Sequence, residues 1–399
     1  MKVPKEEQLS DYINELTLYY GARSERQYEG TSKALSLLLW WLVAFPALFT
    51  VTAIYSFILF IFPRKVDKHA KCETKICVAR TFATSNKLRF LTKEAVTFFS
   101  EKPFSKVEQN NIYNLPLKHR LIAFLRSFSI FLKDFSKLSS EVSNYLPLRG
   151  AFSAIKLYIP RFAHKVNFTS YFSELLNLYN PSVVVTGNKE DRFALSEQTI
   201  CKEKGIKLVC YPHGLEYAIQ LPRGVVGDTF YCYSQATKKY YEDIYKNFDQ
   251  TFIYSPEVVQ RLLGRQIEKE NVERRIVFFP ESRGKDINLM ILSLLLENGI
   301  DVYLKLHPLD SKDDYIELGL PPENIIDDFS QAISGNVILA RKSTVLLEAL
   351  YSGSLSCALL FDSDDSKSFH EQFPSLWDDR IKQVTDVDEL IQWLSSKVA

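Results

Sequence analysis

Short apolar runs alternate with helical patterns through the second half of the chain. PSVVVTGN and IKLVCYPHG are runs rich in β-branched residues that predict buried strands, and FALSEQTICKEKG between them has helical spacing and ends at Gly205. TFYCYSQATKKYYEDIY continues the pattern, and KICVART predicts an earlier first strand. Residues 115–179, which lie between this first strand and PSVVVTGN, have apolar positions at helical spacing. This rhythm predicts βαβ units and a parallel sheet that is covered on both faces.

A second set of such units follows the charged stretch QIEKENVERR. RIVFFPES, IDVYLKLHP, NVILARKS and LSCALLFD predict strands, whereas DINLMILSLLLENG, TVLLEALYSG and DVDELIQWLSSKV predict helices. We therefore expect an α/β protein with two Rossmann-like domains, residues 72–265 and 272–399, that face a central cleft.

One segment near the N-terminus has a different pattern. From Ala34 to Pro63 the chain carries no charge and is dominated by apolar residues, and about 20 such residues suffice to cross a bilayer. The polar residues 1–33 before it predict a short surface helix. A cleaved signal peptide is not expected, because the run is too long and is not followed by a small-residue cleavage site. A buried helix of a soluble domain is less consistent with so long an uncharged run.

Two membrane geometries are compatible with this segment. A straight span places the first residues on the far side of the membrane, whereas a re-entrant hairpin broken at Pro46 keeps both basic flanks on the cytoplasmic face. In both geometries the basic cluster from Arg64 to Lys71 places the two large domains at the cytoplasmic side of an inner membrane.

Composition narrows the function classes. The 399 residues carry a net charge of +1, which gives no electrostatic case for a nucleic-acid binder, and 46% hydrophobic residues exclude a mostly disordered chain. The six cysteines are scattered without a CxxC pair, so neither a zinc site nor a disulfide scaffold is expected, and a reducing cytoplasmic compartment fits best.

The loops that follow the predicted strands carry the candidate chemistry, because ligands of open parallel sheets bind beyond the carboxyl ends of the strands. In RKST, Ser343 or Thr344 would cap a helix whose free N–H groups hold a phosphate, and Lys342 adds positive charge. Glu348 shares a helix face with Thr344 and would accept hydrogen bonds from ribose hydroxyls. A plain helix cap and a core-edge glutamate are the alternative interpretations.

Two further loops add cations to the predicted donor site. In KLHP, Pro308 ends the strand and helps to orient His307, which can donate to a phosphate oxygen, although a single histidine at such a place is often structural. In PESRGKD, Arg283 and Lys285 flank a flexible glycine. The Walker motif, GxGxxG, HExxH and GxSxG do not occur, so we expect no metal and no dinucleotide cofactor.

The first domain contributes candidates for a general base. Glu190 and Asp191 follow one predicted strand, and His213 and Glu216 follow the next, in PHGLE. Any of the four could take a proton from an acceptor hydroxyl, and the sequence does not rank them.

The PHG turn, KLHP and the K-S-T-x-x-x-E-A-L helix start resemble bacterial GT-B glycosyltransferases of surface polysaccharide assembly. Within this group the chain is most similar to the CMP-sugar users, the sialyltransferases and Kdo transferases of capsule and lipopolysaccharide synthesis, over roughly residues 180–362. The resemblance implies that His307, Ser343 and Thr344 hold the CMP phosphate, and that the first domain supplies the acceptor contacts and the base.

The resemblance implies a membrane-associated, metal-independent glycosyltransferase. It would move an acidic sugar from a CMP donor onto a polysaccharide or lipid-linked acceptor at the cytoplasmic face of the inner membrane. A teichoic-acid polymerase type of enzyme, which transfers glycerol phosphate from CDP-glycerol, is similar in its His-Gly turn and is one alternative. A catalytically inactive, membrane-tethered assembly component is the other.

Overall fold

The structure is a computed structural model that divides the chain into two compact units. It describes residues 33–62, 74–80, 82–94, 96–101, 110–145, 148–187, 192–212, 214–218, 220–221, 224–264, 274–281, 284–307 and 310–398. The N-terminal unit comprises residues 1–213, 220–230 and 247–251, and the C-terminal unit comprises residues 214–219, 231–246 and 252–399. The C-terminal unit thus takes in three stretches of the expected domain of residues 72–265, namely 214–219, 231–246 and 252–265. Residues 1–32 of the polar helix expected within residues 1–33 lie outside the described residues.

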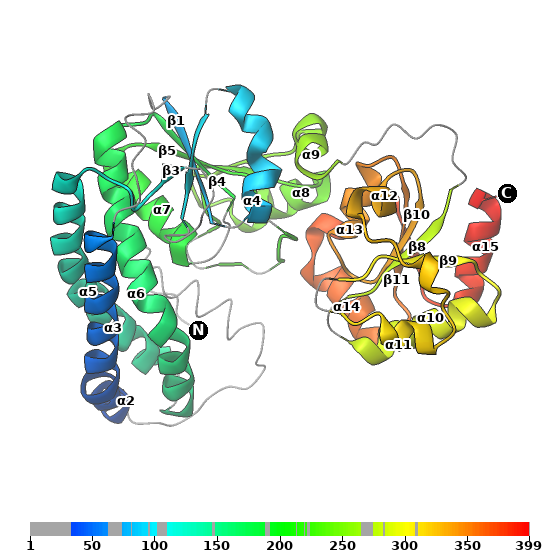
Figure 1. The fold of residues 1–399 in the computed structure, drawn as a ribbon, viewed down its shortest axis with the longest axis horizontal. Helices are drawn as coiled ribbons and strands as arrows, with labels where there is room; N and C mark the ends of the chain where they lie inside the picture. The colour runs from blue at the N-terminus through cyan, green and yellow to red at the C-terminus, as the bar shows by residue number, and fades with distance from the viewer. Residues whose placement is uncertain are drawn as a thin grey trace. The chain divides into compact units, whose positions relative to one another are not determined.

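A seven-stranded sheet forms the centre of the N-terminal unit and continues to its boundary (Figure 1). In spatial order its strands are β3 (Asn110–Asn111), β2 (Val96–Ser100), β1 (Lys75–Ala79), β4 (Val183–Thr186), β5 (Lys207–Cys210), β6 (Thr229–Tyr231) and β7 (Thr251–Ile253). The strand β1 pairs in parallel with β2 on one side and with β4 on the other. The first six strands therefore have the 3-2-1-4-5-6 order of the Rossmann fold.

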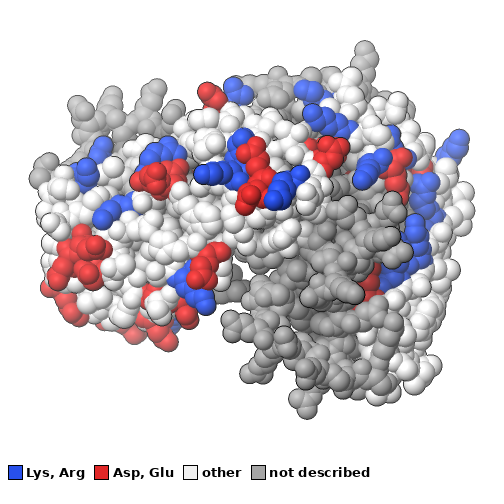
Figure 2. Space-filling model, turned by 180° about the vertical axis from the view of Figure 1, so that it is seen from behind, with Lys and Arg blue, Asp and Glu red and all other residues white. Residues whose placement is uncertain are grey.

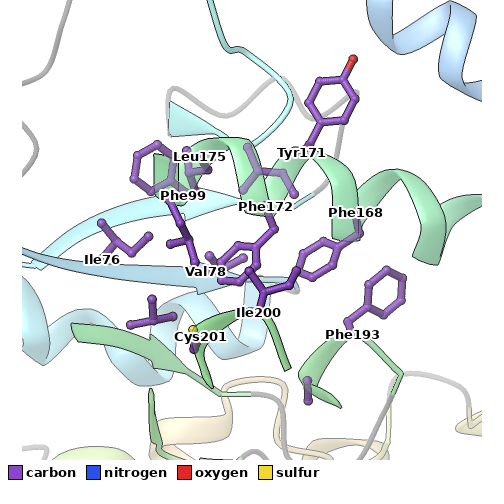
Figure 3. Packing of buried hydrophobic residues seen from close by; sticks show 14 of the residues in the cluster. Ile76, Val78, Phe99, Phe168, Tyr171, Phe172, Leu175, Phe193, Ile200 and Cys201 are labelled. Carbon is purple, nitrogen blue, oxygen red and sulfur yellow. The ribbon is translucent and has the colours of Figure 1, made fainter. Parts of the chain in front are cut away.

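Two helices cover one face of this sheet. Alternate residues of β1, Ile76 and Val78, pack with Phe99 of β2 against α6 (Leu148–Tyr179) and α7 (Arg192–Lys204), as Figure 3 shows. Gly205 follows α7 with φ of 65°, a left-handed conformation that ends the helix as the sequence predicts. The shorter helices α4 (Phe82–Lys87) and η4 (Leu88–Glu94) lie between β1 and β2 in the chain.

The apolar N-terminal segment is one helical rod. It runs through α2 (Lys33–Leu39), the π-helical η3 (Trp40–Ala44) and α3 (Phe45–Ile61), and it packs on α5 (Leu117–Tyr145) and α6. The expected alternative of a hairpin broken at Pro46 is wrong. The N–H of Phe45 donates to the carbonyl of Trp40, five residues earlier, which makes a wider π-helical turn. Pro46, which has no N–H to donate, comes directly after this turn, and the helix continues through it without reversing.

Among the described residues, this is the single helix that is both long and apolar enough to cross a membrane, judged by length and composition. It is also attached to the rest of the unit. Trp40, Ala44 and Leu48 are buried in a cluster with Phe131 of α5 and Phe162 of α6. The segment is therefore neither a free-standing helix nor an enclosed core helix.

The C-terminal unit has a five-stranded sheet in which each strand pairs in parallel with its neighbours. In spatial order the strands are β12 (Ile381–Val384), β11 (Leu355–Leu359), β10 (Val337–Ala340), β8 (Ile276–Phe279) and β9 (Val302–Leu304). The chain leaves β8 to form β9 on one side and returns to form β10 on the other. This is the 2-1-3-4-5 order of doubly wound folds, in which the order reverses between the first and third strands, here β8 and β10.

Helices cover both faces of this second sheet. The helices α10 (Lys285–Glu297) and α15 (Val387–Val398) pack on one face through Leu292 and Leu390, and α13 (Val345–Leu350) contacts β10 and β11. The remaining helices of the unit are α8 (Gln235–Ile244), α9 (Pro256–Leu263), α11 (Asp313–Glu317), η5 (Pro322–Asn324), α12 (Phe329–Ile333), α14 (Ser363–Gln372) and η6 (Pro374–Leu376). The expected α/β class with two Rossmann-like parallel sheets is confirmed.

Charged side chains of both signs lie among one another on the face of the described residues seen in Figure 2. This distribution agrees with the near balance of 49 basic and 48 acidic residues in the sequence.

The central strand β10 contributes to the core of the C-terminal unit. Leu339 is fully buried between two neighbouring strands and the helices that cover the sheet. We expect Leu339→Ala to lower the free energy of unfolding by about 2 to 5 kcal/mol, because it removes buried contacts and leaves a cavity. Urea denaturation measures the change, and Met290→Ala, at a position 44% exposed on α10, should cost far less.

Candidate functional site

A pocket of about 400 Å³ lies in the C-terminal unit, where β8, β9 and β10 end. Segments that directly follow these three strands supply most of its wall. The lining residues are Phe279, Pro280, Glu281, Lys305, Leu306, His307, Phe329, Lys342, Ser343 and Val345. The pocket therefore occupies the place where the strand order reverses, which is the usual ligand site of such sheets.

Backbone hydrogen bonds fix the segment after β9. The N–H of Lys305 donates to the carbonyl of Phe278 at 3.1 Å, and the N–H of Asp310 donates to the carbonyl of His307 at 2.9 Å. The His307 side chain is exposed at the pocket, and the ammonium of Lys305 donates to the carbonyl of Leu306 at 3.3 Å. The end of β9 thus presents one ammonium and one imidazole to the pocket.

The segment after β10 forms the opposite wall. The hydroxyl of Ser343 accepts the N–H of Val345 at 3.3 Å, so Ser343 makes the local capping hydrogen bond at the start of α13. Thr344 is half-buried and makes no capping hydrogen bond through its side chain. Because α13 has only six residues, the positive character of this wall comes chiefly from Lys342.

Lys342 belongs to a buried ion-pair network. Asp365, near the start of α14, binds Arg341 through both carboxylate oxygens and accepts Lys342 Nζ at 2.8 Å. Burial alone would raise the pKa of Asp365, but hydrogen bonds from Arg341 and Lys342 outweigh it and lower that pKa. The oxygen of Asn288 accepts a further Arg341 N–H at 3.3 Å. The network orients two successive cations at the end of β10.

Glu281 is the carboxylate of the pocket wall. Its Oε1 accepts the N–H of Lys342 at 2.8 Å, and its Oε2 lies 4.0 Å from Arg341 Nη1. Burial raises the pKa of Glu281, although these two neighbours partly oppose the rise. Lys342 is thus held by a carboxylate on each side, through its backbone N–H by Glu281 and through its side chain by Asp365.

The close approach of Arg341 also requires a glycine at the start of α10. Gly284 has φ of 77°, and a Cβ atom placed on it would lie 2.8 Å from Arg341 Nη1. A larger residue there would be strained and would displace the guanidinium.

The structure brings together three of the donor-site residues predicted from the sequence, since His307, Lys342 and Ser343 line one pocket. Lys285 lies outside its lining, with a largely exposed side chain that pairs with Asp314 at 2.7 Å. Glu348 is buried on α13 and is not part of the lining either. Arg283 and Pro308 lie outside the described residues.

Of the predicted general bases, Glu216 is described and the other three are not. Glu216 is fully buried in the C-terminal unit, where its Oε1 accepts the N–H of Tyr233 at 2.9 Å and its own N–H donates to Ser375 at 3.2 Å. Glu190, Asp191 and His213 lie outside the described residues, so their role stays a prediction.

A second polar cluster lies in the N-terminal unit and was missed by the sequence analysis. Arg80 directly follows β1, and Glu101 directly follows the adjacent strand β2. The buried carboxylate of Glu101 pairs with Nε2 of His164 on α6, and the side chain of His164 is 30% exposed. Phe193 packs against both the His164 ring, at 4.8 Å, and the Arg80 guanidinium, at 4.1 Å. A buried carboxylate thus holds an imidazole whose side chain is partly exposed.

The rule that selected the other loops would have found this cluster. VTFFS is a run of β-branched and aromatic residues, and recognition of it as a strand would have placed Glu101 at a strand end. His164 carries no such signal, because it lies in the middle of a long helix. Burial, with the nearby charge of Glu101 and other groups, also raises the pKa of Tyr113 beside the cluster.

No protein-family model matches the sequence, and no curated protein matches it. Among solved structures, the chain is similar to UDP-GlcNAc 2-epimerase from Methanocaldococcus jannaschii, with a TM-score of 0.47 and 10% identity over 81% of this chain and 92% of that chain. It is also similar to UDP-GlcNAc 2-epimerase from Neisseria meningitidis bound to UDP-GlcNAc, with a TM-score of 0.46 and 9% identity over 81% of this chain and 90% of that chain. Similarity at this level assigns neither an activity nor a substrate.

The ion-pair network should make stability depend on pH. Because the folded state lowers the pKa of Asp365, its contribution is present above the ordinary aspartate range and is lost as the pH falls below about 4. We expect Asp365→Asn to cost about 3 to 5 kcal/mol at neutral pH, since it leaves Arg341 buried without its partner. Urea denaturation along a pH series should show this difference shrinking in acid. Asp364→Asn, at an exposed neighbouring position, should cost less than about 1 kcal/mol.

Proposed function

We propose that the chain is a membrane-associated glycosyltransferase that binds a nucleotide-linked sugar in the pocket of its C-terminal unit. The observation that carries the proposal is the convergence of His307, Lys305, Lys342 and Ser343 on one pocket at the reversal point of a doubly wound sheet. We further propose a CMP-linked acidic sugar as donor and a growing surface-polysaccharide or lipopolysaccharide glycan as acceptor, on the sequence resemblance.

The size and charge of the pocket support a phosphate-bearing ligand. A volume of about 400 Å³ lies within the usual range of small-molecule sites, which is about 300 to 1,000 Å³. Phe279, Phe329 and Val345 supply apolar wall on which a base or sugar can pack, and the cations supply donors for phosphate oxygens. Lys342 is held in place by Asp365 before any ligand arrives, which lowers the cost of ordering it on binding.

The proposed reaction breaks the bond between the anomeric carbon and the nucleotide phosphate. Negative charge then develops on the departing phosphate, where hydrogen bonds from His307, Ser343 and Lys342 would stabilise it. The acceptor hydroxyl forms the new bond to the anomeric carbon and gives its proton to a base. The cations of the pocket would supply the charge compensation that a metal provides in other transferases.

The proposed reaction needs a base to take the proton of the acceptor hydroxyl. Glu190, Asp191, His213 and Glu216 are the candidates from the sequence. The pair of His164 and Glu101 adds a fifth candidate, in which Glu101 holds the imidazole and His164 takes the proton.

Nucleotide binding tests the donor site. We expect His307→Ala to weaken binding of the preferred nucleotide by about tenfold or more, because it removes a hydrogen bond to a charged phosphate. Calorimetry of the detergent-solubilised protein against CMP, CDP, UDP and GDP measures the effect. His370→Ala, at an exposed position on α14 outside the pocket, should bind as the parent chain does.

The nucleotide preference separates the alternatives. Selective CMP binding supports the acidic-sugar transferase, and selective CDP binding supports the glycerophosphate transferase. A preference for UDP or GDP replaces the donor and keeps the pocket. If none of the four binds the parent chain, the inactive assembly component becomes the better interpretation.

Acceptor-dependent turnover tests the His164 pair. We expect His164→Asn to lower kcat by about 10² to 10⁴, with nucleotide affinity unchanged, because the variant keeps a polar side chain but loses the proton acceptor. The measurement is nucleotide release in the presence of glycolipid acceptors. His119→Asn is the matched control, because His119 also pairs with a buried carboxylate, that of Glu174, at 3.1 Å. This pair joins α5 to α6 and does not lie at a strand end. Equal losses in both variants would show that the effect is structural.

A further inference from the structure

The apolar N-terminal segment exposes apolar side chains and buries polar ones, which is the reverse of a helix in a soluble protein. The side chains that it exposes are almost all apolar, and they include Leu42 at 67%, Ile54 at 56% and Phe57 at 55% exposure. Its hydroxyl side chains Ser36, Thr52 and Ser56 are instead buried. A helix surrounded by water shows the opposite arrangement, with its polar side chains on the exposed face.

The buried hydroxyls of the segment make hydrogen bonds where helices meet. Ser56 lies 3.1 Å from the hydroxyl of Ser127 on α5, and Ser36 accepts the hydroxyl of Ser143 on the same helix at 3.1 Å. Thr52 donates to the carbonyl of Leu48 at 2.7 Å. Small hydroxyl residues between closely packed helices, with apolar residues outside, are typical of helices in a lipid environment.

The exposed apolar surface continues from α3 onto α5. Phe128 and Phe131 of α5 lie 6.1 and 5.4 Å from Phe49 of α3, so they define the line along which the two helices touch. The leucines Leu121, Leu125 and Leu132 of α5 are exposed and lie at helical spacing beside that line. We call these three leucines, with the exposed Leu38, Trp41, Leu42, Phe49, Ile54 and Phe57, the apolar face.

Two exposed lysines lie on the far side of α5. Lys133 and Lys137 are exposed one helical step beyond the leucines. Asp134 is paired with Lys165 at 2.5 Å, and residues 33–62 contain no acidic residue. The apolar face is therefore bordered on α5 by lysines whose charge complements the anionic headgroups of phospholipids.

We propose that the apolar face inserts into the acyl region of a lipid bilayer, with Lys133 and Lys137 at its headgroups. The membrane contact is thus a two-helix surface made by α3 and α5, and the segment does not cross the bilayer as a solitary helix. Two contacts support this mode of binding. Arg120 of α5 donates to the carbonyl of Phe60 at 2.6 Å, and Tyr55 packs against the core of the N-terminal unit. A helix covered by its own unit on one face can meet lipid only on the other.

Adjacent positions on α5 allow a sharp test. Leu132 and Lys133 lie at the same height on the helix but about 100° apart around it. The full chain carrying Leu132→Cys or Lys133→Cys would be labelled with a small fluorophore in vesicles of mixed phosphatidylcholine and phosphatidylglycerol. The parent chain, labelled in the same way, gives the background from its six own cysteines, of which the five described ones are buried. We expect brominated acyl chains to quench the label at Leu132 and not the label at Lys133, and aqueous iodide to show the reverse.

Two results would overturn the proposal. Equal quenching of both labels by iodide would show that the α5 leucines face water. A Leu132 label shielded from both quenchers, together with a dimer in solution, would show that a second copy of the chain covers the face. Both positions are exposed, so the substitutions themselves should cost little stability. Neither result bears on the donor pocket, which belongs to the other unit.

Discussion

The pocket of the C-terminal unit depends on the ion pair between Arg341 and Asp365. A guanidinium buried at the end of a central strand is tolerable only when a carboxylate meets it with two hydrogen bonds, and Asp365 does so from the start of α14. The same carboxylate holds Lys342, which faces the pocket. The side chain of Asp365 thus joins α14 to the end of β10 and to the wall of the pocket. Gly284 at the start of α10 leaves room for the Arg341 guanidinium in this arrangement.

The sequence predicts most of the sheet architecture, because buried parallel strands and the helices between them have strong hydrophobic patterns. It also predicts that KLHP and RKST belong to one site, since both follow strands. It does not identify Asp365 or Glu281 as partners of Lys342, because their pairing depends on how α14 and β8 pack on the sheet. Long-range contacts of this kind leave no local pattern in the chain.

The N-terminal unit shows the same limit in another form. Length and lack of charge identify residues 34–63 as apolar enough for a membrane, but they do not show which face of the helix is covered. The π-helical turn before Pro46 keeps the rod continuous where proline alone predicts a break. The pairing of His164 with Glu101 likewise joins a helix to a strand end, and the spacing of residues in the sequence gives no sign of it.

Tyr55 connects α3 to the polar cluster around His164. Its ring meets that of His164 at 5.9 Å on the covered side of the helix, while Ile54 and Phe57 lie on the open side. One helix thus has an exposed apolar side and, one side-chain layer away, a side that packs against His164. A shift or tilt of α3 would therefore change the packing around His164, so the two sides of this helix are mechanically coupled.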